Sequence, residues 1–537
     1  MRWPATHFGD CICTDRLRGR VGNRPLELLS IDLRKACAHP AKTSTLIYNL
    51  DSFNRLLETM GYSRVLSVFG RRRPWKLLGS SVIFAFMLGC GDIYRPVVTS
   101  IPPVEPSSQP TKYAIVTSCG NNTNVSAPTI DQICSTSNVP GYGSLVDFSG
   151  DSLAIRLNLG SGPRWVGLAP NSNGSGGIVY NTNDDGTVTN FSISTTVESH
   201  QVYSSTLLAN ADPSTMLSTR NYLYVSQTGR GSVEVMKTAN GAFSPAGFLE
   251  IPLKDPNNSS ALQYPVNMVG NRTAQRIYAI SYADNGLPAP RCPGSNSPGV
   301  ATGIETSTNT PSSNLPLGLC PVYGVMSSDN RRVFILNQGS GTVSVIDSQQ
   351  NQIDKSANLI SNQPGVPAGQ IAVGQGPVWA DIYNTGAILA VANSGSNTVT
   401  LINISEDVFG NDSPNFGKII ATIPVGSNPS SISVLQDGTR AYVANRGDGT
   451  VSVVSLISNI VTKTIPLPQE PCSAGSPNVL CIVHPMSIGA TTGTPTGKVY
   501  VVSPDTNMLT IIQTIDDTID TTLPLTGNGI QVYLTGP

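Results

Sequence analysis

The chain has 537 residues, of which only 12% are charged, while 51 are glycine and 40 are proline. Helical bundles and coiled coils contain far more Glu, Lys and Arg, so the composition excludes them. The hydrophobic share of 39% also excludes a disordered chain. Turn-forming residues combined with Val, Ile, Thr and Tyr predict an all-β protein.

The net charge of −1 conceals an asymmetry along the chain. Residues 1–76 contain 14 Lys/Arg and 6 Asp/Glu, whereas residues 77–537 contain 19 and 28. Nucleic-acid-binding proteins carry a basic stripe on their folded part, and here that part is acidic. We therefore expect no nucleic-acid partner.

An export signal is predicted at residues 71–90. Three arginines and a lysine at 71–76 precede an uncharged, largely apolar run from Leu77 to Gly89, which ends at Cys90. This run is shorter than the roughly 20 residues that span a bilayer, but it suits the apolar core of a secretory signal. The segment resembles a bacterial lipoprotein signal, which implies cleavage before Cys90 and lipidation of its thiol. An ordinary signal peptide or an uncleaved anchor is the alternative, and either would still export the remainder.

The segments on both sides of this signal have no predicted fold. Residues 1–70 are interpreted as a non-structural leader or a misassigned start, with Met60 a suitable distance upstream of the basic cluster. A genuine cytosolic extension is the alternative. Residues 91–111 include a proline-rich run, which we interpret as a spacer between the membrane and a domain at 112–537.

The cysteine spacing agrees with export. Six cysteines beyond Cys90 fall into three local pairs that bracket loops rich in Gly, Ser, Pro and Asn. No pair has zinc-ligand spacing, and residues 91–537 contain only two histidines, so no metal site is expected. We predict three disulfides, each stabilising by about 2–4 kcal/mol, with free cysteines as the alternative. The predicted pairs are Cys119 with Cys134, Cys292 with Cys320, and Cys472 with Cys481.

One unit of four predicted strands recurs seven times. Each unit opens on a proline, and successive prolines are 50 to 56 residues apart. An apolar stretch, a turn and a second strand follow, then in most copies a third and a fourth strand. The prolines are Pro163, Pro213, Pro265, Pro321, Pro377, Pro429 and Pro485.

The second and third strands carry a recognisable motif. YVANRGDGTVSVVS (442–455), LAVANSGSNTVTLIN (389–403) and FILNQGSGTVSVID (334–347) resemble the YVTN family of β-propeller repeats. The resemblance covers residues 163–527 and implies a propeller of four-stranded blades. The copy at Pro265 departs most, because an insertion carrying Cys292 separates its second and third strands.

The two ends of the domain are predicted to close the ring. A single four-stranded sheet cannot bury its own faces, but sheets stacked around an axis bury one another. Residues 113–118, 144–150 and 152–160 imitate strands two to four of a unit, and residues 529–536 imitate strand one. A composite blade built from both ends gives eight blades, with seven, the commoner number in this family, as the alternative.

Few residues suggest chemistry. Two tryptophans lie at equivalent positions, two residues after repeat prolines, where they pack in the core or line a ligand groove. Three charged residues lie on turns between second and third strands and could share one face, and a histidine lies in a connection near one mouth of the ring. These candidate ligand-face residues are Trp165, Trp379, His484, Arg230, Arg446 and Asp448.

No catalytic residue set, metal site or cofactor is predicted. The chain has no nucleophile elbow, phosphate-binding loop or haem-attachment motif. The Asp/Asn-rich turns lack the spaced acidic pattern of a calcium loop.

These features favour an exported, membrane-anchored and monomeric β-propeller in a bacterial cell envelope, either periplasmic or at the cell surface. It would act as a binding or scaffold module for a protein or glycan and would contact the lipid bilayer through its N-terminal anchor. The alternative is an enzyme, because some propellers that the chain resembles are lactonases or cofactor-linked dehydrogenases.

Overall fold

The computed structural model describes most of the chain between Tyr113 and Thr535. The described residues are 113–120, 139–170, 177–193, 201–239, 242–254, 263–271, 273–283, 298–356, 359, 365–383, 387–407, 411–471, 480–491 and 497–535. The predicted leader, signal and spacer lie outside these residues, and so does Cys90. No helix in the described part is long and apolar enough to cross a membrane.

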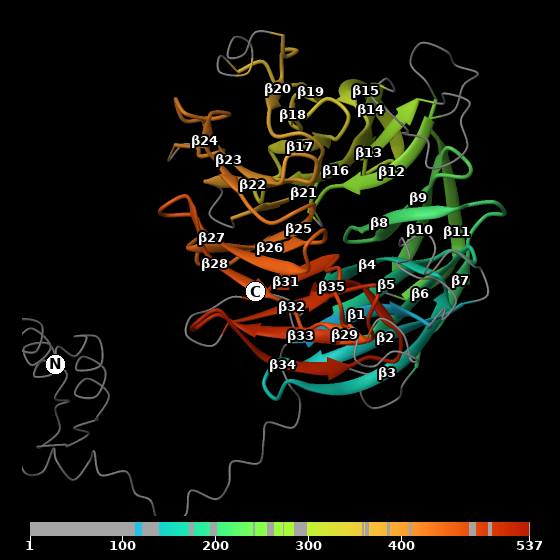
Figure 1. The fold of residues 1–537 in the computed structure, drawn as a ribbon. Helices are drawn as coiled ribbons and strands as arrows, with labels where there is room; N and C mark the ends of the chain where they lie inside the picture. Colours follow the sequence, from blue (N-terminus) through green and yellow to red (C-terminus); the bar gives the residue numbers. More distant parts are fainter. Residues whose placement is uncertain are drawn as a thin grey trace, which may run out of the picture. The chain divides into compact units, whose positions relative to one another are not determined.

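The fold is an eight-bladed β-propeller (Figure 1), as predicted. Each blade is a four-stranded antiparallel sheet, and apart from the first it takes its strands in chain order from the innermost to the outermost. We name the blades A to H in chain order. In blade E a further short strand, β20 (Gln370–Ala372), pairs with β18 (Thr342–Asp347).

Blades B to E take their strands from residues 163–372. Blade B contains β4 (Pro163–Pro170), β5 (Gly177–Asn183), β6 (Thr187–Ser192) and β7 (Tyr203–Thr206). Blade C contains β8 (Pro213–Ser218), β9 (Tyr222–Gln227), β10 (Ser232–Ala239) and β11 (Ala242–Pro252). Blade D contains β12 (Gln263–Val269), β13 (Arg276–Ala283), β14 (Pro298–Glu305) and β15 (Thr310–Leu319). Blade E contains β16 (Pro321–Met326), β17 (Arg332–Asn337), β18 (Thr342–Asp347), β19 (Gln352–Ile353) and β20 (Gln370–Ala372).

Three further blades and a small hairpin follow. Blade F contains β21 (Pro377–Ile382), β22 (Ile388–Asn393), β23 (Thr398–Asn403) and β24 (Ile419–Pro424). Blade G contains β25 (Pro429–Val434), β26 (Arg440–Asn445), β27 (Thr450–Ser455) and β28 (Ile460–Pro466). The hairpin of β29 (Glu470–Pro471) and β30 (Leu480–Cys481) precedes blade H, which contains β31 (Ser487–Ala490), β32 (Lys498–Val502), β33 (Met508–Gln513) and β34 (Thr518–Pro524).

Blade A joins the two ends of the domain. Its inner strand β35 (Asn528–Leu534) pairs antiparallel with β1 (Tyr113–Cys119), which continues into β2 (Pro140–Asp147) and β3 (Ser152–Ser161). The Tyr113 N–H also donates to Thr535 Oγ1 at 2.8 Å. The predicted composite blade is therefore confirmed, and with it the count of eight.

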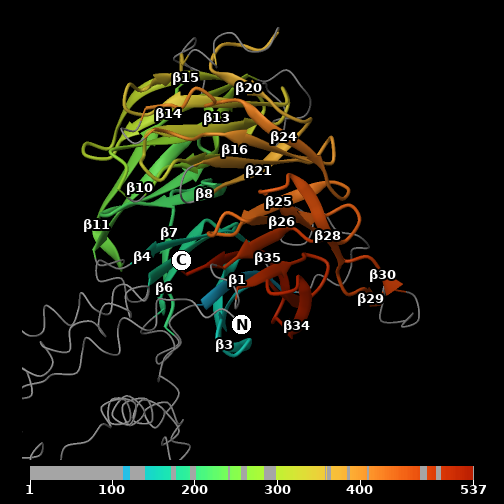
Figure 2. The ribbon, with the colours of Figure 1, turned by 90° about the vertical axis from the view of Figure 1, so that its left-hand side faces the viewer.

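The innermost strands form a closed circle (Figures 1 and 2). Each one contacts the innermost strand of the next blade, and β35 contacts both β31 and β4. No blade is therefore left with an uncovered face at the point of closure.

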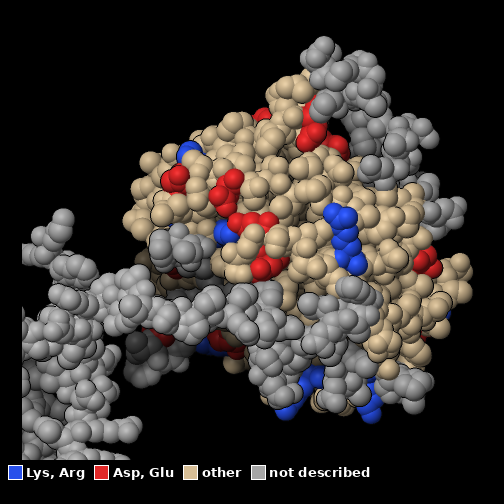
Figure 3. All heavy atoms as spheres, turned by 90° about the horizontal axis from the view of Figure 1, so that it is seen from below, with Lys and Arg blue, Asp and Glu red and all other residues tan. Residues whose placement is uncertain are grey.

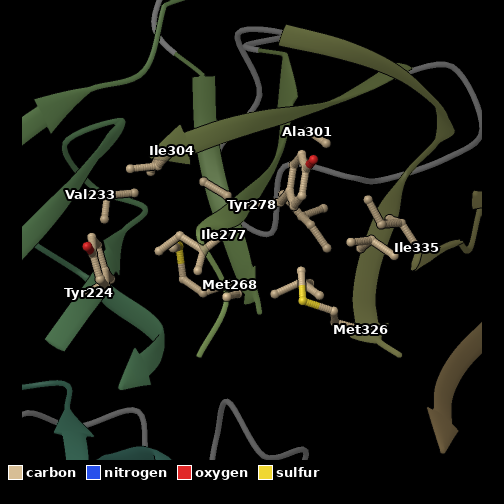
Figure 4. Packing of buried hydrophobic residues seen from close by; sticks show 14 of the residues in the cluster. Tyr224, Val233, Met268, Ile277, Tyr278, Ala301, Ile304, Met326 and Ile335 are labelled. Atoms are coloured by element: carbon tan, nitrogen blue, oxygen red, sulfur yellow. The ribbon is translucent and has the colours of Figure 1, made fainter. Parts of the chain in front are cut away.

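The middle strands are buried on both faces, because each blade is packed between two others. Every residue of β17 is buried, and β26 is buried except at its first residue, whereas the outer strand β28 is mostly exposed. Figure 4 shows one such core, in which Tyr224, Ile277 and Ile335 come from three successive blades. Hydrophobic burial between blades is thus the main stabilising contribution.

The asparagine that ends the motif strand connects its blade to the preceding one. Asn445 Nδ2 donates to Thr450 Oγ1 and Ser452 Oγ, both at 2.9 Å. A Cβ added to Gly426, just after the fourth strand of blade F, would lie 2.5 Å from Asn445 Nδ2. Three other glycines stand equally tightly against the equivalent asparagine of the next blade, namely Gly160, Gly318 and Gly374. The glycine is required because the asparagine side chain occupies the space of its missing Cβ.

A second contact joins several blades to the following one. The Tyr442 hydroxyl donates to Asp517 of blade H, and Arg440 pairs with the same carboxylate at 2.7 Å. Asp517 has a positive φ and lies in the turn between the third and fourth strands. At the closure of the ring, Lys498 of blade H forms an ion pair with Asp151 of blade A, which also has a positive φ.

Three of the six paired cysteines lie among the described residues. Cys119, Cys320 and Cys481 are each disulfide-bonded. Their expected partners, Cys134, Cys292 and Cys472, lie outside the described residues, so the pairing itself stays a prediction.

Candidate functional site

The repeat proline shapes the inner strand of most blades. A register shift follows it in β4, β8, β12, β16, β21 and β25. Proline has no N–H to donate to the ladder, and a bulge at this point accommodates it. Trp165, Tyr323 and Trp379 all stand two residues after such a proline.

These three aromatic side chains, which we call the hub cluster, meet across the axis of the ring. Tyr323 and Trp379 stack with their ring centroids 4.2 Å apart and their planes at 16°. Trp165 lies 5.9 Å from Trp379 and 6.4 Å from Tyr323. Because blades B and F are opposite each other in an eight-bladed ring, the contact between the two tryptophans crosses the centre. Aromatic side chains therefore occupy the axis at this level.

One carboxylate lies beside the hub cluster. Asp381 Oδ2 accepts a hydrogen bond from the Val434 N–H of blade G at 2.8 Å, and its Oδ1 accepts from the Ile382 N–H at 2.8 Å. Burial raises the pKa of Asp381 to about 6, although these two hydrogen bonds oppose the shift. This partly buried acid therefore holds a proton under mildly acidic conditions.

The charge of this carboxylate affects the pKa of two tyrosines. Burial raises the pKa of Tyr323 and of Tyr533, and the negative charge of Asp381 raises both further. Tyr533 belongs to blade A, three blades away from Asp381, so the carboxylate must lie close to the axis. Tyr533 is 40% exposed, which shows that solvent reaches this part of the hub.

Side chains of the inner strands satisfy the N–H groups of neighbouring blades. Ser433 Oγ accepts from Ala490 N–H at 3.0 Å, and Ser487 Oγ accepts from Val532 N–H at 3.2 Å. Gln531 Oε1 accepts from Val166 N–H at 2.9 Å. Together with Asp381, these bonds run from blade F through the closure to blade B. These polar side chains thus stabilise the fold. The N–H groups on the free edge of an inner strand have no further strand to bind, so side chains of the neighbouring blade accept from them instead.

The predicted turn residues are mostly engaged within their own blades. Arg230 binds Glu250 through two nitrogens, at 2.8 and 3.0 Å, and donates to the Ala209 carbonyl at 2.9 Å. Its guanidinium lowers the pKa of Glu250. Asp448 accepts from the Ser427 N–H at 2.8 Å and from a threonine hydroxyl, so it fixes a turn. Arg446 makes no side-chain hydrogen bond or ion pair with the described residues, and its blade lies opposite that of Arg230.

His484 is held by the carboxylate of Asp505, which no sequence motif marks as its partner. Its Nδ1 lies 2.6 Å from Asp505 Oδ2, and its backbone N–H donates to the same carboxylate at 3.0 Å. The His484 side chain is 40% exposed. An imidazole oriented in this way through Nδ1 keeps Nε2 for another partner, which is the arrangement of a general base.

The structure thus brings together only two of the six predicted ligand-face residues, Trp165 and Trp379. Figure 3 shows acidic and basic side chains scattered singly or in small groups over one face of a mostly uncharged surface. The described residues contain no group of three or more His, Cys, Asp or Glu side chains that could hold a metal ion.

Comparison with known proteins supports the fold. No protein-family model and no curated protein matches the chain. Among solved structures, the dihydro-heme d1 dehydrogenase NirN in complex with DHE is similar, with a TM-score of 0.53 and 11% identity over 82% of this chain and 79% of that one. Apo AztD from Citrobacter koseri has a TM-score of 0.48 and 10% identity over 79% of this chain and 97% of that one. At such identities the likeness to NirN shows the propeller fold and nothing about activity.

Proposed function

We propose that this chain is an exported β-propeller that acts as a binding or scaffold module in a bacterial cell envelope, anchored to a membrane through Cys90. The observation that carries the binding role is the contact of Trp165, Tyr323 and Trp379 across the axis. Because aromatic rings occupy the hub, recognition is left to the turns at the ends of the blades. Three disulfide-bonded cysteines support the exported location, since disulfides persist in oxidising compartments.

Cell fractionation tests the location and the anchor. The wild-type protein should sediment with membranes and be cleaved by protease added to spheroplasts or whole cells. The variant Cys90→Ser should leave the membrane fraction, whereas the control Cys37→Ser, in the leader, should not. A wild-type protein found in the cytosol would contradict the proposal.

Capture from detergent-solubilised envelope tests the binding role. The purified protein and its Trp379→Leu variant should enrich the same envelope protein or glycan, because the hub cluster is not the recognition surface. If nothing is enriched over a matrix control, the binding role is wrong. If only Trp379→Leu loses the partner, recognition takes place at the axis and the assignment to blade ends is wrong.

A second candidate function, that of an enzyme such as a lactonase, is favoured by the pairing of His484 with Asp505. An imidazole oriented by a carboxylate and partly open to solvent can accept a proton from water. Lactone hydrolysis should be measured with and without EDTA for the wild type, His484→Gln and the control His200→Gln. Hydrolysis that is lost only in His484→Gln would favour the enzyme over the binding module.

A further inference from the structure

A groove of about 430 Å³ lies between blades C and D. Its walls are the turn that leads into β9 and the turn that leads into β13, with Thr306 at its side. This volume lies in the range of small-molecule sites. None of the residues of the groove belongs to the predicted ligand face.

The backbone of both turns is fixed by hydrogen bonds. The N–H and the hydroxyl of Thr219 donate to the Tyr222 carbonyl at 2.8 and 3.1 Å. In blade D, the N–H and the hydroxyl of Thr306 both donate to the Gln275 carbonyl at 2.9 Å. The walls are therefore pre-organised, and a ligand would not have to order them.

Three side chains that project from these turns have no partner among the described residues. Arg220, Asn221 and Gln275 are exposed, and among the described residues none of them has a side-chain hydrogen bond or ion pair. Most other arginines of the described residues differ in this respect, for example Arg230 with Glu250 and Arg440 with Asp517. A guanidinium and two amides thus offer unused donors and acceptors around one hollow.

The charge of the groove is opposite to that of the domain around it. No acidic residue is among the described residues that line it, although residues 77–537 contain more Asp and Glu than Lys and Arg. A guanidinium binds a carboxylate through two parallel hydrogen bonds, which gives both strength and orientation. The groove is therefore suited to an anionic ligand.

The lining also indicates what the rest of the ligand resembles. Ala274 is the largest aliphatic side chain among the described residues of the groove, so an apolar peptide side chain would find little to pack against. Tyr222 is half-buried, and its ring can pack against an apolar ligand face. Planar amides beside an aromatic ring suit a molecule that combines many hydroxyls with a C–H face.

We propose that this groove binds a carboxylated saccharide, with the carboxylate on Arg220, hydroxyls on Asn221 and Gln275, and a sugar face on Tyr222. The inference deepens the proposed binding role and rests on it, because it names the class of ligand. The site lies at the end of the blades where first strands lead into second strands. Arg446, which lies on a turn between second and third strands at the other end, provides a matched control.

Titration calorimetry on the purified protein tests the proposal with trigalacturonic acid, a hyaluronan tetrasaccharide and sialyllactose. At least one of them should bind, and neutral maltotriose should bind at least tenfold more weakly. Arg220→Ala should weaken the binding at least tenfold, Arg220→Lys should weaken it less, and Arg446→Ala should leave it unchanged. Circular dichroism should show equal folding of all variants, as expected for exposed side chains.

Three results would overturn the inference: no binding of any acidic sugar, equal affinity for maltotriose, or unchanged affinity in Arg220→Ala. Loss of binding in Arg446→Ala alone would move the site to the other end of the blades and would also overturn it. If envelope capture succeeds while sugar binding fails, the ligand class is wrong and the binding role stands. If both fail, the binding role falls as well.

Discussion

The partly buried carboxyl group of Asp381 makes the stability of the ring dependent on pH. Its pKa is about 6 in the folded protein and 3.8 as the ordinary value. Between these pH values the folded state binds more protons than the unfolded state, so the free energy of unfolding falls as the pH rises. The destabilisation is absent below about pH 4 and complete above about pH 7.

The size of the effect follows from the two pKa values. At about 1.4 kcal/mol per pH unit, the difference between 6 and 3.8 corresponds to about 3 kcal/mol. The unfolding entropy is about 2 cal/mol/K per residue, so this amounts to roughly 3 °C in the Tm of a domain of this length. Asp381→Asn removes the titration, while its amide oxygen can still accept from the Val434 N–H.

Calorimetric unfolding at pH 4 and pH 8 measures the effect. The Tm of Asp381→Asn relative to the wild type should rise by about 3 °C between pH 4 and pH 8. Loss of the hydrogen bond from the Ile382 N–H shifts the Tm of the variant equally at both pH values and does not affect this difference. Ser433→Ala is the matched control, because Ser433 makes the equivalent bond to the next blade but has no carboxyl group. The reasoning would be refuted if the difference between Asp381→Asn and the wild type were the same at both pH values.

Two further predictions concern the contacts between blades. Gly426→Ala should lower the free energy of unfolding by about 1–3 kcal/mol through overpacking against Asn445. The control Gly150→Ala should change it little, because its added Cβ would meet nothing closer than 3.4 Å. Chemical denaturation measures both variants, and equal effects would contradict the contact. Lys498→Met should lower the Tm by a few degrees, because it leaves the carboxylate of Asp151 without its cation at the closure of the ring. The loss of Tm should be smaller when Asp151→Asn is combined with Lys498→Met. Additive losses would show that the two side chains are uncoupled.

The blade count could be predicted because each strand of the repeat carries its own local signal. The proline of the first strand and the YVAN-type second strand recur at nearly constant spacing, and third and fourth strands follow in most copies. Closure was also predictable, since residues at both ends imitate the missing strands of one unit. These signals are local in the sequence, so they can be recognised without knowing which blades face each other.

The hub could be predicted only in part. Tyr323 stands at the same offset from its proline as Trp165 and Trp379, so the same alignment could have found it. Asp381 and Tyr533 could not be found in this way, because which side chains meet across the axis depends on the number of blades and their tilt. The partner of His484 was equally hidden, since Asp505 lies 21 residues further along the chain in a turn with no motif of its own.

The position of β35 in blade A has a consequence for the order in which the molecule is assembled. Residues 528–534 leave the ribosome after all the other strands, yet they form the innermost strand of the blade whose other strands are made first. Until that moment β1 has an unpaired edge, and the first and last blades have no common sheet to join them. The ring therefore cannot close until this late segment is available, and closure requires the complete domain.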